Sequence, residues 1–255
     1  MENSDKKLSS LKSLFILEAL SRSSDYMSIN KIAAISGHSQ STVHRILNEM
    51  IQCGFVEKNE SYKKYKLGMQ AVIFASRFIT SNSLITAAHD ELKELNRITG
   101  ETVHLVSVSD FEMVYLDKID TKHALGLMSA VGKRNPLYCT SGGKAIMAFC
   151  NDEWITDFFS RVKLEAYTAN TFTDSQTLRI ELSKIHVQGY ALDNCEHHDD
   201  IICIGAPIFS RTGDNPIAAI SVAAPSYRFT IEMAEGYAQT VMESAKNISL
   251  KYGNI

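Results

Sequence analysis

The 255-residue sequence has no uninterrupted apolar run of the roughly 18 residues that a membrane-spanning helix needs. Its first residues, MENSDKKLSSLKSLF, lack the apolar core and small-residue cleavage site of a signal peptide. The five cysteines are scattered and odd in number, which argues for reduced thiols and against a disulfide framework. These absences predict a cytoplasmic protein with no membrane partner.

Proline is scarce and charge is unevenly distributed. All four prolines lie in the second half of the chain. Residues 1–68 hold ten Lys and Arg against seven Asp and Glu, whereas the remainder holds sixteen against twenty-two. A mildly basic first part on an acidic body suits a module that binds a polyanion. Composition therefore predicts two parts with different roles.

The first 68 residues predict three helices and a β-hairpin. The first helix lies in LSSLKSLFILEALSRSS, where Leu11, Leu14, Phe15 and Leu17 or Glu18 follow helical spacing and should form the buried stripe. The second, in SINKIAAIS, should be capped by Ser28 and bury Ile29, Ile32 and Ala33. Gly37 permits a tight turn before the third helix, and GFVEKNESYKKYKLG reads as two short strands around Asn59–Ser61.

The third helix has an apolar stripe and a polar face of unusual content. Its inward stripe is Val43, Ile46, Leu47, Met50 and Ile51, and Ser39 is placed to cap it. Helix, helix, turn, helix and hairpin in this order form the winged helix-turn-helix plan, whose third helix enters the DNA major groove. Arg can bind guanine and Gln or Asn adenine, while wing lysines suit phosphates. The predicted contacts with double-stranded operator DNA are Ser39, Gln40, Ser41, Thr42, His44, Arg45, Asn48, Lys63 and Lys64. The alternative is a surface helix whose polar face is merely solvated.

The segment MQAVIFASRFITSN after Gly68 is apolar almost all round, with Arg77 as its one charge. Such a helix must be covered, either by its own domain or by the same helix of a second subunit. We expect residues 69–81 to be a linker helix that makes a dimer, since symmetric dimers suit palindromic operators. The domains expected are therefore residues 1–68 for DNA binding, 69–81 for the linker and 82–255 for a sensor.

Residues 82–255 mix helices with antiparallel strands, which predicts an α+β domain. LITAAHDELKELNRITG is a helix ending at Gly100, and TVHLVSVSDFEMVYLDKI is a hairpin turning at Ser109–Asp110. ALGLMSAVGKRNPLY reads as a further extended run. SGGKAIMAF begins a helix, Thr173 or Asp174 begins another, and the last helix runs from about Thr230 to Tyr252. YALDN, IICIGAPIF and PIAAISVAAP complete the sheet, with the turn RTGDNP between the last two.

Several motifs in this order resemble the IclR family of bacterial transcription regulators: STVHRIL, the wing end YKLG, PLYCTSGGKAIMAF, GYALDNCE and CIGAPIFSRTGDNPIAAISVAAPSYR. The resemblance covers nearly the whole chain. It implies a winged helix-turn-helix joined by a helix to a GAF-like effector domain. It further implies a homodimer or homotetramer that responds to a metabolite such as a sugar acid, a keto acid or an aromatic carboxylate.

The stretch TSGGKA places Ser141, Gly142 and Gly143 at a helix start, where free N–H groups favour a small anionic metabolite. The alternative is that the two glycines only permit close packing. The spacing does not match a nucleotide P-loop, because Tyr138 stands where the first glycine would be. By resemblance to the family pocket, the effector contacts are Ser141, Gly142, Asp193, Cys203 and Ser221, while Ala223 stands where some members have a second serine.

No metal or other cofactor is expected. NCEHHDDIIC carries many ligand types, but neighbouring residues of an extended segment point to opposite faces and the spacing matches no closed zinc pattern. An enzyme using Cys139 or Ser141 as its nucleophile lacks an accompanying catalytic signature. A second alternative is a DNA-binding protein whose C-terminal domain only oligomerises. The sequence predicts a regulator and no enzyme.

Overall fold

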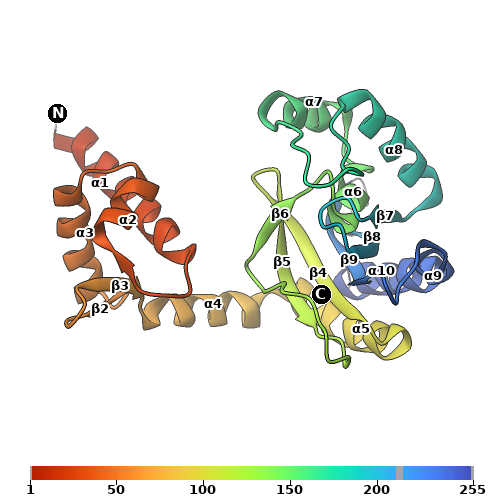
Figure 1. Ribbon diagram of the computed structural model, residues 1–255, viewed down its shortest axis with the longest axis horizontal. Helices are drawn as coiled ribbons and strands as arrows, with labels where there is room; N and C mark the ends of the chain where they lie inside the picture. The colour runs from red at the N-terminus through yellow and green to blue at the C-terminus, as the bar shows by residue number, and fades with distance from the viewer. Residues whose placement is uncertain (1, 211–214, 254–255) are drawn as a thin grey trace. The chain divides into compact units, whose positions relative to one another are not determined.

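The computed structural model describes residues 2–210 and 215–253, with side chains from Leu11 on (Figure 1). The chain divides into two compact units, Met1–Ser81 and Asn82–Ile255. The first has the elements of a winged helix-turn-helix. The second holds an antiparallel sheet between helices, so that the predicted α+β class and the GAF-like architecture are confirmed.

Three helices and a small sheet form the first unit. The elements are α1 (Glu2–Ser21), β1 (Met27–Ser28), α2 (Ile29–Ser36), α3 (Gln40–Gln52), β2 (Val56–Asn59), β3 (Lys64–Leu67) and α4 (Met69–Ser81). The hydroxyl oxygens of Ser28 and Ser39 accept the N–H groups of Lys31 and Thr42, so both predicted N-caps are present. Gly37 closes α2 with a left-handed φ of 70°, a conformation that glycine adopts without strain.

The core of this unit confirms the predicted stripes of α2 and α3 but not that of α1. Val43, Ile46 and Leu47 are fully buried, and Ile51 packs against them. On α1 the predicted stripe was wrong: Leu11, Leu14 and Phe15 are exposed, and Ile16, Ala19 and Leu20 are buried instead. The two stripes lie about 140° apart around the helix, and both are apolar. Periodicity alone therefore could not decide which one faces α2 and β3.

The wing is a three-stranded sheet in the order β1-β3-β2, with Met27 opposite Tyr65 in antiparallel register. The sequence predicted only β2 and β3, because a strand of two residues is too short to show an alternating pattern.

Helix α4 has no buried residue, although it is largely apolar. Met69, Val72, Phe74 and Phe78 are all more than half exposed. Of these four side chains, only that of Phe74 has an aromatic neighbour among the described residues of this unit, the ring of Phe55 at 5.1 Å. Within this chain, the first unit does not cover the linker helix.

The second unit is built on six antiparallel strands in the order β6-β5-β4-β9-β8-β7. Its strands are β4 (Thr102–Ser109), β5 (Glu112–Ile119), β6 (Arg134–Pro136), β7 (Ala191–Asn194), β8 (Ile201–Phe209) and β9 (Pro216–Pro225). Its helices are α5 (Ser83–Thr99), α6 (Ser141–Met147), α7 (Asp152–Arg161), α8 (Ser175–Gln188), α9 (Ile231–Gly236) and α10 (Ala238–Gly253).

Helices cover both faces of this sheet (Figure 1). Leu92 and Leu95 of α5 and Val241 of α10 share one apolar core with the strands. Helices α6, α7 and α8 form the second core, which contains Phe158 and Leu182. The double cover explains why β8 and β9 are apolar on both sides, since both faces of these strands are buried.

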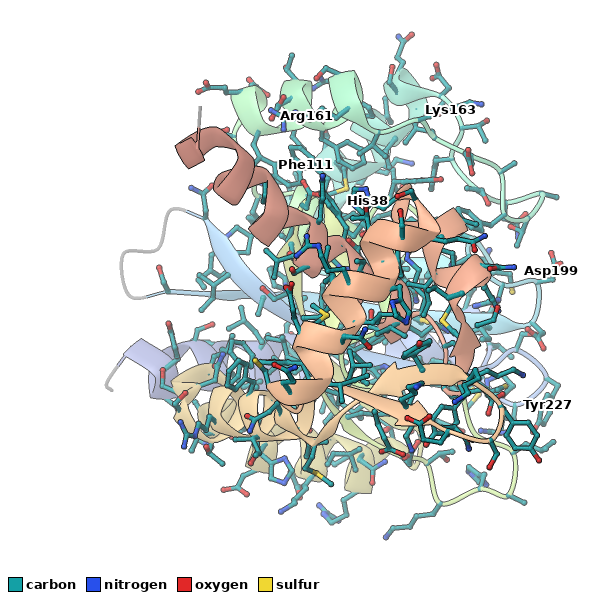
Figure 2. All side chains as sticks on the ribbon, turned by 90° about the vertical axis from the view of Figure 1, so that its left-hand side faces the viewer. His38, Phe111, Arg161, Lys163, Asp199 and Tyr227 are labelled. Carbon is teal, nitrogen blue, oxygen red and sulfur yellow. The ribbon has the colours of Figure 1, made fainter. Side chains whose placement is uncertain are left out.

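The tip of the β4–β5 hairpin is fixed by aromatic packing against α7. Asp110 and Phe111 turn the chain with φ of 53° and 58°. The ring of Phe111 lies 5.5 Å from the guanidinium carbon of Arg161, and Figure 2 labels both residues. The same ring lies 5.0 Å from the Trp154 ring. The sequence predicted this turn but not α7, which Asn151 caps through its side chain.

Two further predictions need correction. In ALGLMSAVGKRNPLY only Arg134–Pro136 is a strand, because the carbonyls of Leu127 and Ser129 are bound by the Lys118 ammonium (3.1 and 2.8 Å) and by no neighbouring strand. The last helix is two helices, which separate at Gly236, a residue of low helix propensity, and Tyr237. In the predicted turn RTGDNP, residues 211–214 lie outside the described part of the chain.

Candidate functional site

The outward face of α3 is polar and exposed as the sequence suggested. Gln40, Ser41, His44, Arg45 and Asn48 are exposed on it. Ser39 and Thr42 are bonded to each other through their hydroxyls at 2.9 Å, at the start of the helix. These two residues therefore shape the helix end. Ser39 is exposed as well, and a DNA contact by Ser39, Thr42 or the five exposed side chains stays a prediction.

Arg45 is paired within its own helix. Its Nη1 lies 2.6 Å from Oε1 of Glu49, one turn further along. Glu49 is exposed on the same face, and the sequence analysis did not single it out, although its i, i+4 spacing from Arg45 predicts this contact. A carboxylate here holds the guanidinium in one orientation and repels phosphates. It is also an acceptor for the amino group of cytosine.

Carboxylates accompany the cations of the wing too. The Glu60 carboxylate lies 2.9 Å from Nζ of Lys58 and 3.0 Å from Nζ of Lys63, and these hydrogen bonds lower the pKa of Glu60. Lys64 is exposed beside them. Because surface pairs are weak and screened by salt, phosphates can displace these carboxylates.

Replacing Lys63 and Lys64 together by alanine should weaken binding to all DNA sequences alike. If each lysine meets one phosphate, the slope of log K against log salt will become shallower by about 1.8. Affinity for an operator and for unrelated DNA should be measured between 50 and 200 mM salt. Lys163→Ala, at an exposed lysine of the second unit (Figure 2), is the control and should leave the slope unchanged. An unchanged slope in the double variant contradicts a wing contact.

In the second unit, separate segments meet at a cavity of about 590 Å³. Five of the six predicted effector residues line it: Ser141, Gly142, Asp193, Cys203 and Ser221. They come from the start of α6 and from β7, β8 and β9, strands that are neighbours in the sheet. Ala223 also lines the cavity. The size is in the range of small-molecule sites.

Gly143 does not line the cavity. A Cβ on it would lie 2.3 Å from the Leu137 carbonyl oxygen, and one on Gly142 would lie 2.7 Å from a methyl carbon of Val106. Close packing of α6 therefore requires both glycines, in agreement with the structural alternative. Gly142 combines this packing role with a place in the cavity wall.

Asp193 is the buried acid of the cavity. It is 3% exposed, its Oδ1 accepts the N–H of Glu196 at 2.8 Å, and it lies opposite Cys203 in the strand register. Burial, and secondarily the nearby Glu196, raises the pKa of Asp193 to about 7. Burial and Asp193 also raise the pKa of the Cys203 thiol well above its usual range. Near neutral pH the cavity therefore contains an acid that can donate a proton in a hydrogen bond.

An ion pair lies behind Asp193. The ammonium of Lys144 on α6 is fully buried, 2.5 Å from Oε1 of Glu196 and 3.9 Å from Glu181 on α8. It also lies 4.9 Å from the centre of the Phe172 ring. The pair ties α6 to the segment after β7, and thereby fixes two sides of the cavity. The sequence gives no signal for it, since 52 residues separate Lys144 from Glu196.

Uncharged polar side chains, among them that of His104, line the remaining wall of the cavity. Burial, together with the charge of Lys118, lowers the pKa of His104 to about 3, and its Nε2 lies 2.8 Å from the Ser129 hydroxyl. Asn135 donates to the Tyr115 hydroxyl at 3.0 Å. Both histidine and tyrosine line the cavity as neutral groups, and the sequence analysis did not predict either contact.

The segment 125–129 covers one side of the cavity and is held by cations. Arg228 binds the carboxylate of Glu101 through two nitrogens (2.7 and 2.9 Å) and also donates to the Leu125 carbonyl at 3.0 Å. Lys118 holds two more carbonyls of this segment, as described above. Leu125 and Met128 are nevertheless largely exposed.

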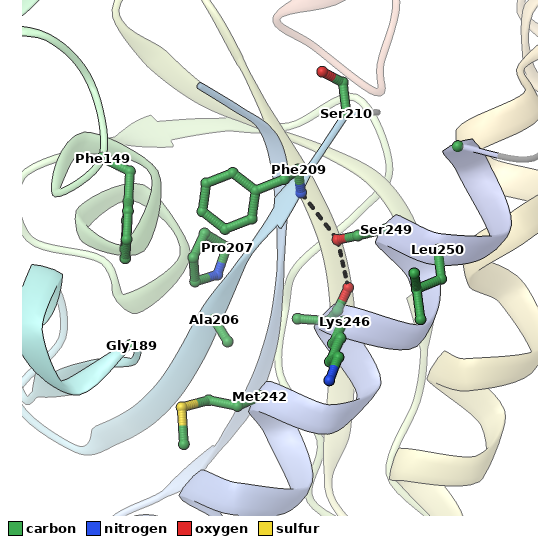
Figure 3. Close-up of a pocket in the computed structure, with 12 residues that line it drawn as sticks. Phe149, Gly189, Ala206, Pro207, Phe209, Ser210, Met242, Lys246, Ser249 and Leu250 are labelled. Carbon is green, nitrogen blue, oxygen red and sulfur yellow. Dashed lines mark hydrogen bonds between the residues drawn. The ribbon is translucent and has the colours of Figure 1, made fainter. Parts of the chain in front are cut away.

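A second cavity, of about 470 Å³, lies between β8 and α10 (Figure 3). It is mainly apolar, with Phe149, Pro207 and Met242 in its wall and Lys246 as its one charged residue among those described. The hydroxyl of Ser249 lies at one wall of this cavity, where it accepts a hydrogen bond from the Phe209 N–H at 3.0 Å. None of the predicted effector residues lies there.

No three His, Cys, Asp or Glu side chains converge as a metal site within residues 11–210 and 215–253, whose side chains the structure describes. His197 and His198 line the first cavity, whereas Asp199 is exposed outside it. In the same described residues no single helix is long and apolar enough to cross a membrane, although α4 and α5 taken together would satisfy that test.

The comparison with known families decides what these two units form. A family profile described as "Bacterial transcriptional regulator IclR C-terminal" matches residues 76–250, and one described as "IclR helix-turn-helix domain" matches residues 11–60. The chain belongs to the IclR family. As a member of this family it is a DNA-binding transcription regulator with an effector-binding C-terminal domain.

Individual relatives agree with this assignment. The HTH-type transcriptional regulator KdgR of Escherichia coli is 32% identical over 98% of this chain and 94% of its own length. The crystal structure of the Thermotoga maritima IclR has a TM-score of 0.74 and 32% identity, with 99% and 100% of the two chains covered. An IclR homologue from Microbacterium hydrocarbonoxydans, complexed with 4-hydroxybenzoate, shares the fold (TM-score 0.81, 21% identity, 97% and 100% covered).

The family membership also rules out the enzyme alternative, since these relatives are regulators. The chemistry of the candidate nucleophile agrees. Cys139 is fully buried and does not line the cavity, and burial raises the pKa of its thiol. A nucleophilic cysteine requires the opposite shift.

Proposed function

We propose that this chain binds operator DNA through α3 and the wing, and that a small carboxylate in the first cavity controls this binding. The observation that carries the effector half is the meeting of Ser141, Gly142, Asp193, Cys203 and Ser221 around one cavity. The neutral donors beside them, and Lys133 at the same cavity, suit an anionic ligand with further oxygen atoms. Sugar acids, keto acids and aromatic carboxylates have this chemistry. The 4-hydroxybenzoate complex of the Microbacterium homologue supports the aromatic class.

The exposed apolar face of α4 supports a homodimer or homotetramer. Met69, Val72, Phe74 and Phe78 would be covered by α4 of a second subunit, which would set the distance between two recognition helices. Half-sites must face the same side of the duplex, so a small change at this helix alters operator affinity greatly. A differential effector affinity of about 1–3 kcal/mol gives roughly 5- to 150-fold regulation. We place residues 1–68, 69–81 and 82–255 as the DNA-binding, linker and effector segments of a cytoplasmic protein.

A thermal-shift screen of the full chain against sugar acids, keto acids and aromatic carboxylates tests the effector half. At 100 times its Kd, a ligand should stabilise the protein by about 2.7 kcal/mol. Asp193→Ala should abolish this shift, because it removes the acid that faces the ligand. Asp199→Ala, on the same segment but outside the cavity, should retain it. A shift of equal size in Asp193→Ala would place the ligand elsewhere, with the second cavity as the next site to test.

A further inference from the structure

The carboxyl of Asp193 faces the cavity without a cation to neutralise it. Its side chain is almost fully buried, and Oδ1 accepts the Glu196 N–H. No salt bridge joins Asp193 to a Lys, Arg or His in the described parts of the chain. An ionised Asp193 would therefore be a buried charge with hydrogen bonds but no counterion.

The nearest cation is already engaged. Lys144 lies 2.5 Å from one carboxylate oxygen of Glu196 and 3.9 Å from Glu181. Lys144 is thus paired with Glu196, while Glu181, which is partly exposed, also lies 3.8 Å from the exposed ammonium of Lys184. Burial raises the pKa of Glu196 as well as that of Asp193. The Lys144 ammonium is paired with Glu196, so Asp193, which has no salt bridge among the described residues, is the acid of this cluster best kept protonated.

The other groups around Asp193 do not change this balance. Cys203 on β8 and Tyr115 on β5 are held neutral by burial, which raises the pKa of both. His104 on β4 is held neutral by the lowering of its pKa. The remaining ionisable groups of the cavity wall are Lys133, His197, His198, Asp200 and Tyr227, and Cys139 lies behind it.

We propose that Asp193 meets the effector as the neutral acid and donates its proton in a hydrogen bond to an anionic oxygen of the ligand. This inference rests on the proposed carboxylate effector. It makes Asp193 the residue that selects a carboxylate over a neutral amide of the same shape. A carboxylate has no proton to offer an ionised Asp193 and would be repelled by it, whereas an amide N–H₂ would bind the ionised form.

Effector binding then takes up a proton whenever free Asp193 is ionised. Because the ligand binds the protonated form of Asp193, the affinity for the ligand is highest below a pH of about 7 and falls above it. Between pH 6 and pH 8 the Kd of a carboxylate should rise about tenfold, and proton uptake should increase from about 0.1 to about 0.9 per ligand.

Isothermal titration calorimetry of the full chain measures both quantities. Pyruvate, galacturonate and 4-hydroxybenzoate should each be titrated at pH 6, 7 and 8, in two buffers of different ionisation enthalpy. The neutral amide of each compound is the matched ligand. Asp193→Asn keeps a donor but cannot ionise, so its Kd should be independent of pH. Asp199→Asn, at the exposed neighbouring acid, should behave as the native protein (Figure 2).

Each outcome has a distinct meaning. Carboxylate binding with proton uptake that Asp193→Asn abolishes supports the inference. Carboxylate binding without proton uptake in the native protein overturns the inference and leaves the proposed function intact, and this result needs no variant to fold. Preference for the amides at pH 6, where Asp193 is mostly protonated, also overturns it. No binding by any of the six compounds overturns the carboxylate effector and the inference with it.

Discussion

Replacing Lys144 by methionine should lower the free energy of unfolding of the second unit by about 3–5 kcal/mol. Methionine fills a similar volume beside Phe172 but leaves the buried Glu196 carboxylate without its counterion. The loss should be largest above neutral pH and smaller in acid. Without the ammonium, the already raised pKa of Glu196 rises further, and protonation of the acid removes the unpaired charge. Urea unfolding of native and variant protein at pH 5.5 and 8 measures both effects.

Lys184 provides the matched control. Its ammonium lies 3.8 Å from the same Glu181 but is 67% exposed, so Lys184→Met should change stability by less than about 0.5 kcal/mol. Adding Glu196→Gln to Lys144→Met should recover most of the loss, because the charge that lost its partner is gone. A Lys144→Met protein within about 1 kcal/mol of native at pH 8 would show that the pair contributes little to this unit.

Arg45→Ala should weaken operator binding by about 1–3 kcal/mol, or roughly 5- to 150-fold, and relax base preference at one position. The expectation follows from its place on the exposed face of α3, where Glu49 holds the guanidinium 2.6 Å away. Binding should be measured against an operator and against the same duplex with single-base changes. Unlike the wing variant, this one should retain its affinity for unrelated DNA.

Arg22 supplies an equivalent pair outside the recognition helix. It lies just past the end of α1 in the same unit, 2.8 Å from Glu18, also at i, i+4. Arg22→Ala removes the same chemistry from the surface and should leave the base preference unchanged. If the two variants lose specificity equally, the operator is read by another part of the unit, and α3 is misassigned.

Local signals predicted the parts of the fold that depend on neighbours along the chain. Ser28, Ser39 and Gly37 end or begin helices through contacts only a few residues away, and they lie where the sequence placed them. The errors arose where distant packing decides. On α1 two apolar stripes compete, and only contact with α2 and β3 selects Ile16 and Leu20. The prediction of an extended run before Arg134 was wrong for a similar reason, because Lys118, on another strand, binds its backbone carbonyls.

The residues of the site also divide into those that the sequence predicted and those that depend on contacts it did not reveal. Resemblance to the family brought Asp193, Cys203 and Ser221 together from three strands, and all three line the cavity. It gave no information on Lys144, whose partner is distant in sequence. It also gave none on Glu49, although the i, i+4 spacing of Glu49 from Arg45 indicates that contact. Gly143 was assigned to a ligand because helix starts bind anions. In the structure its missing side chain makes room for Leu137 instead.

The carboxylates of Glu49 and Glu60 have a consequence for how such a regulator finds its operator. Arg45 and Lys63 each have an internal counterion before DNA arrives, so contact with a random phosphate must first displace a carboxylate. The displacement weakens binding to DNA of any sequence more than it weakens binding at an operator, because contacts with the bases there offset the loss of the carboxylate pairs. A chromosome offers millions of competing positions, and occupancy depends on the ratio of the two affinities. In the proposed DNA complex, these acidic residues of α3 and the wing should shorten the time spent at wrong sequences and leave more of the protein free to search.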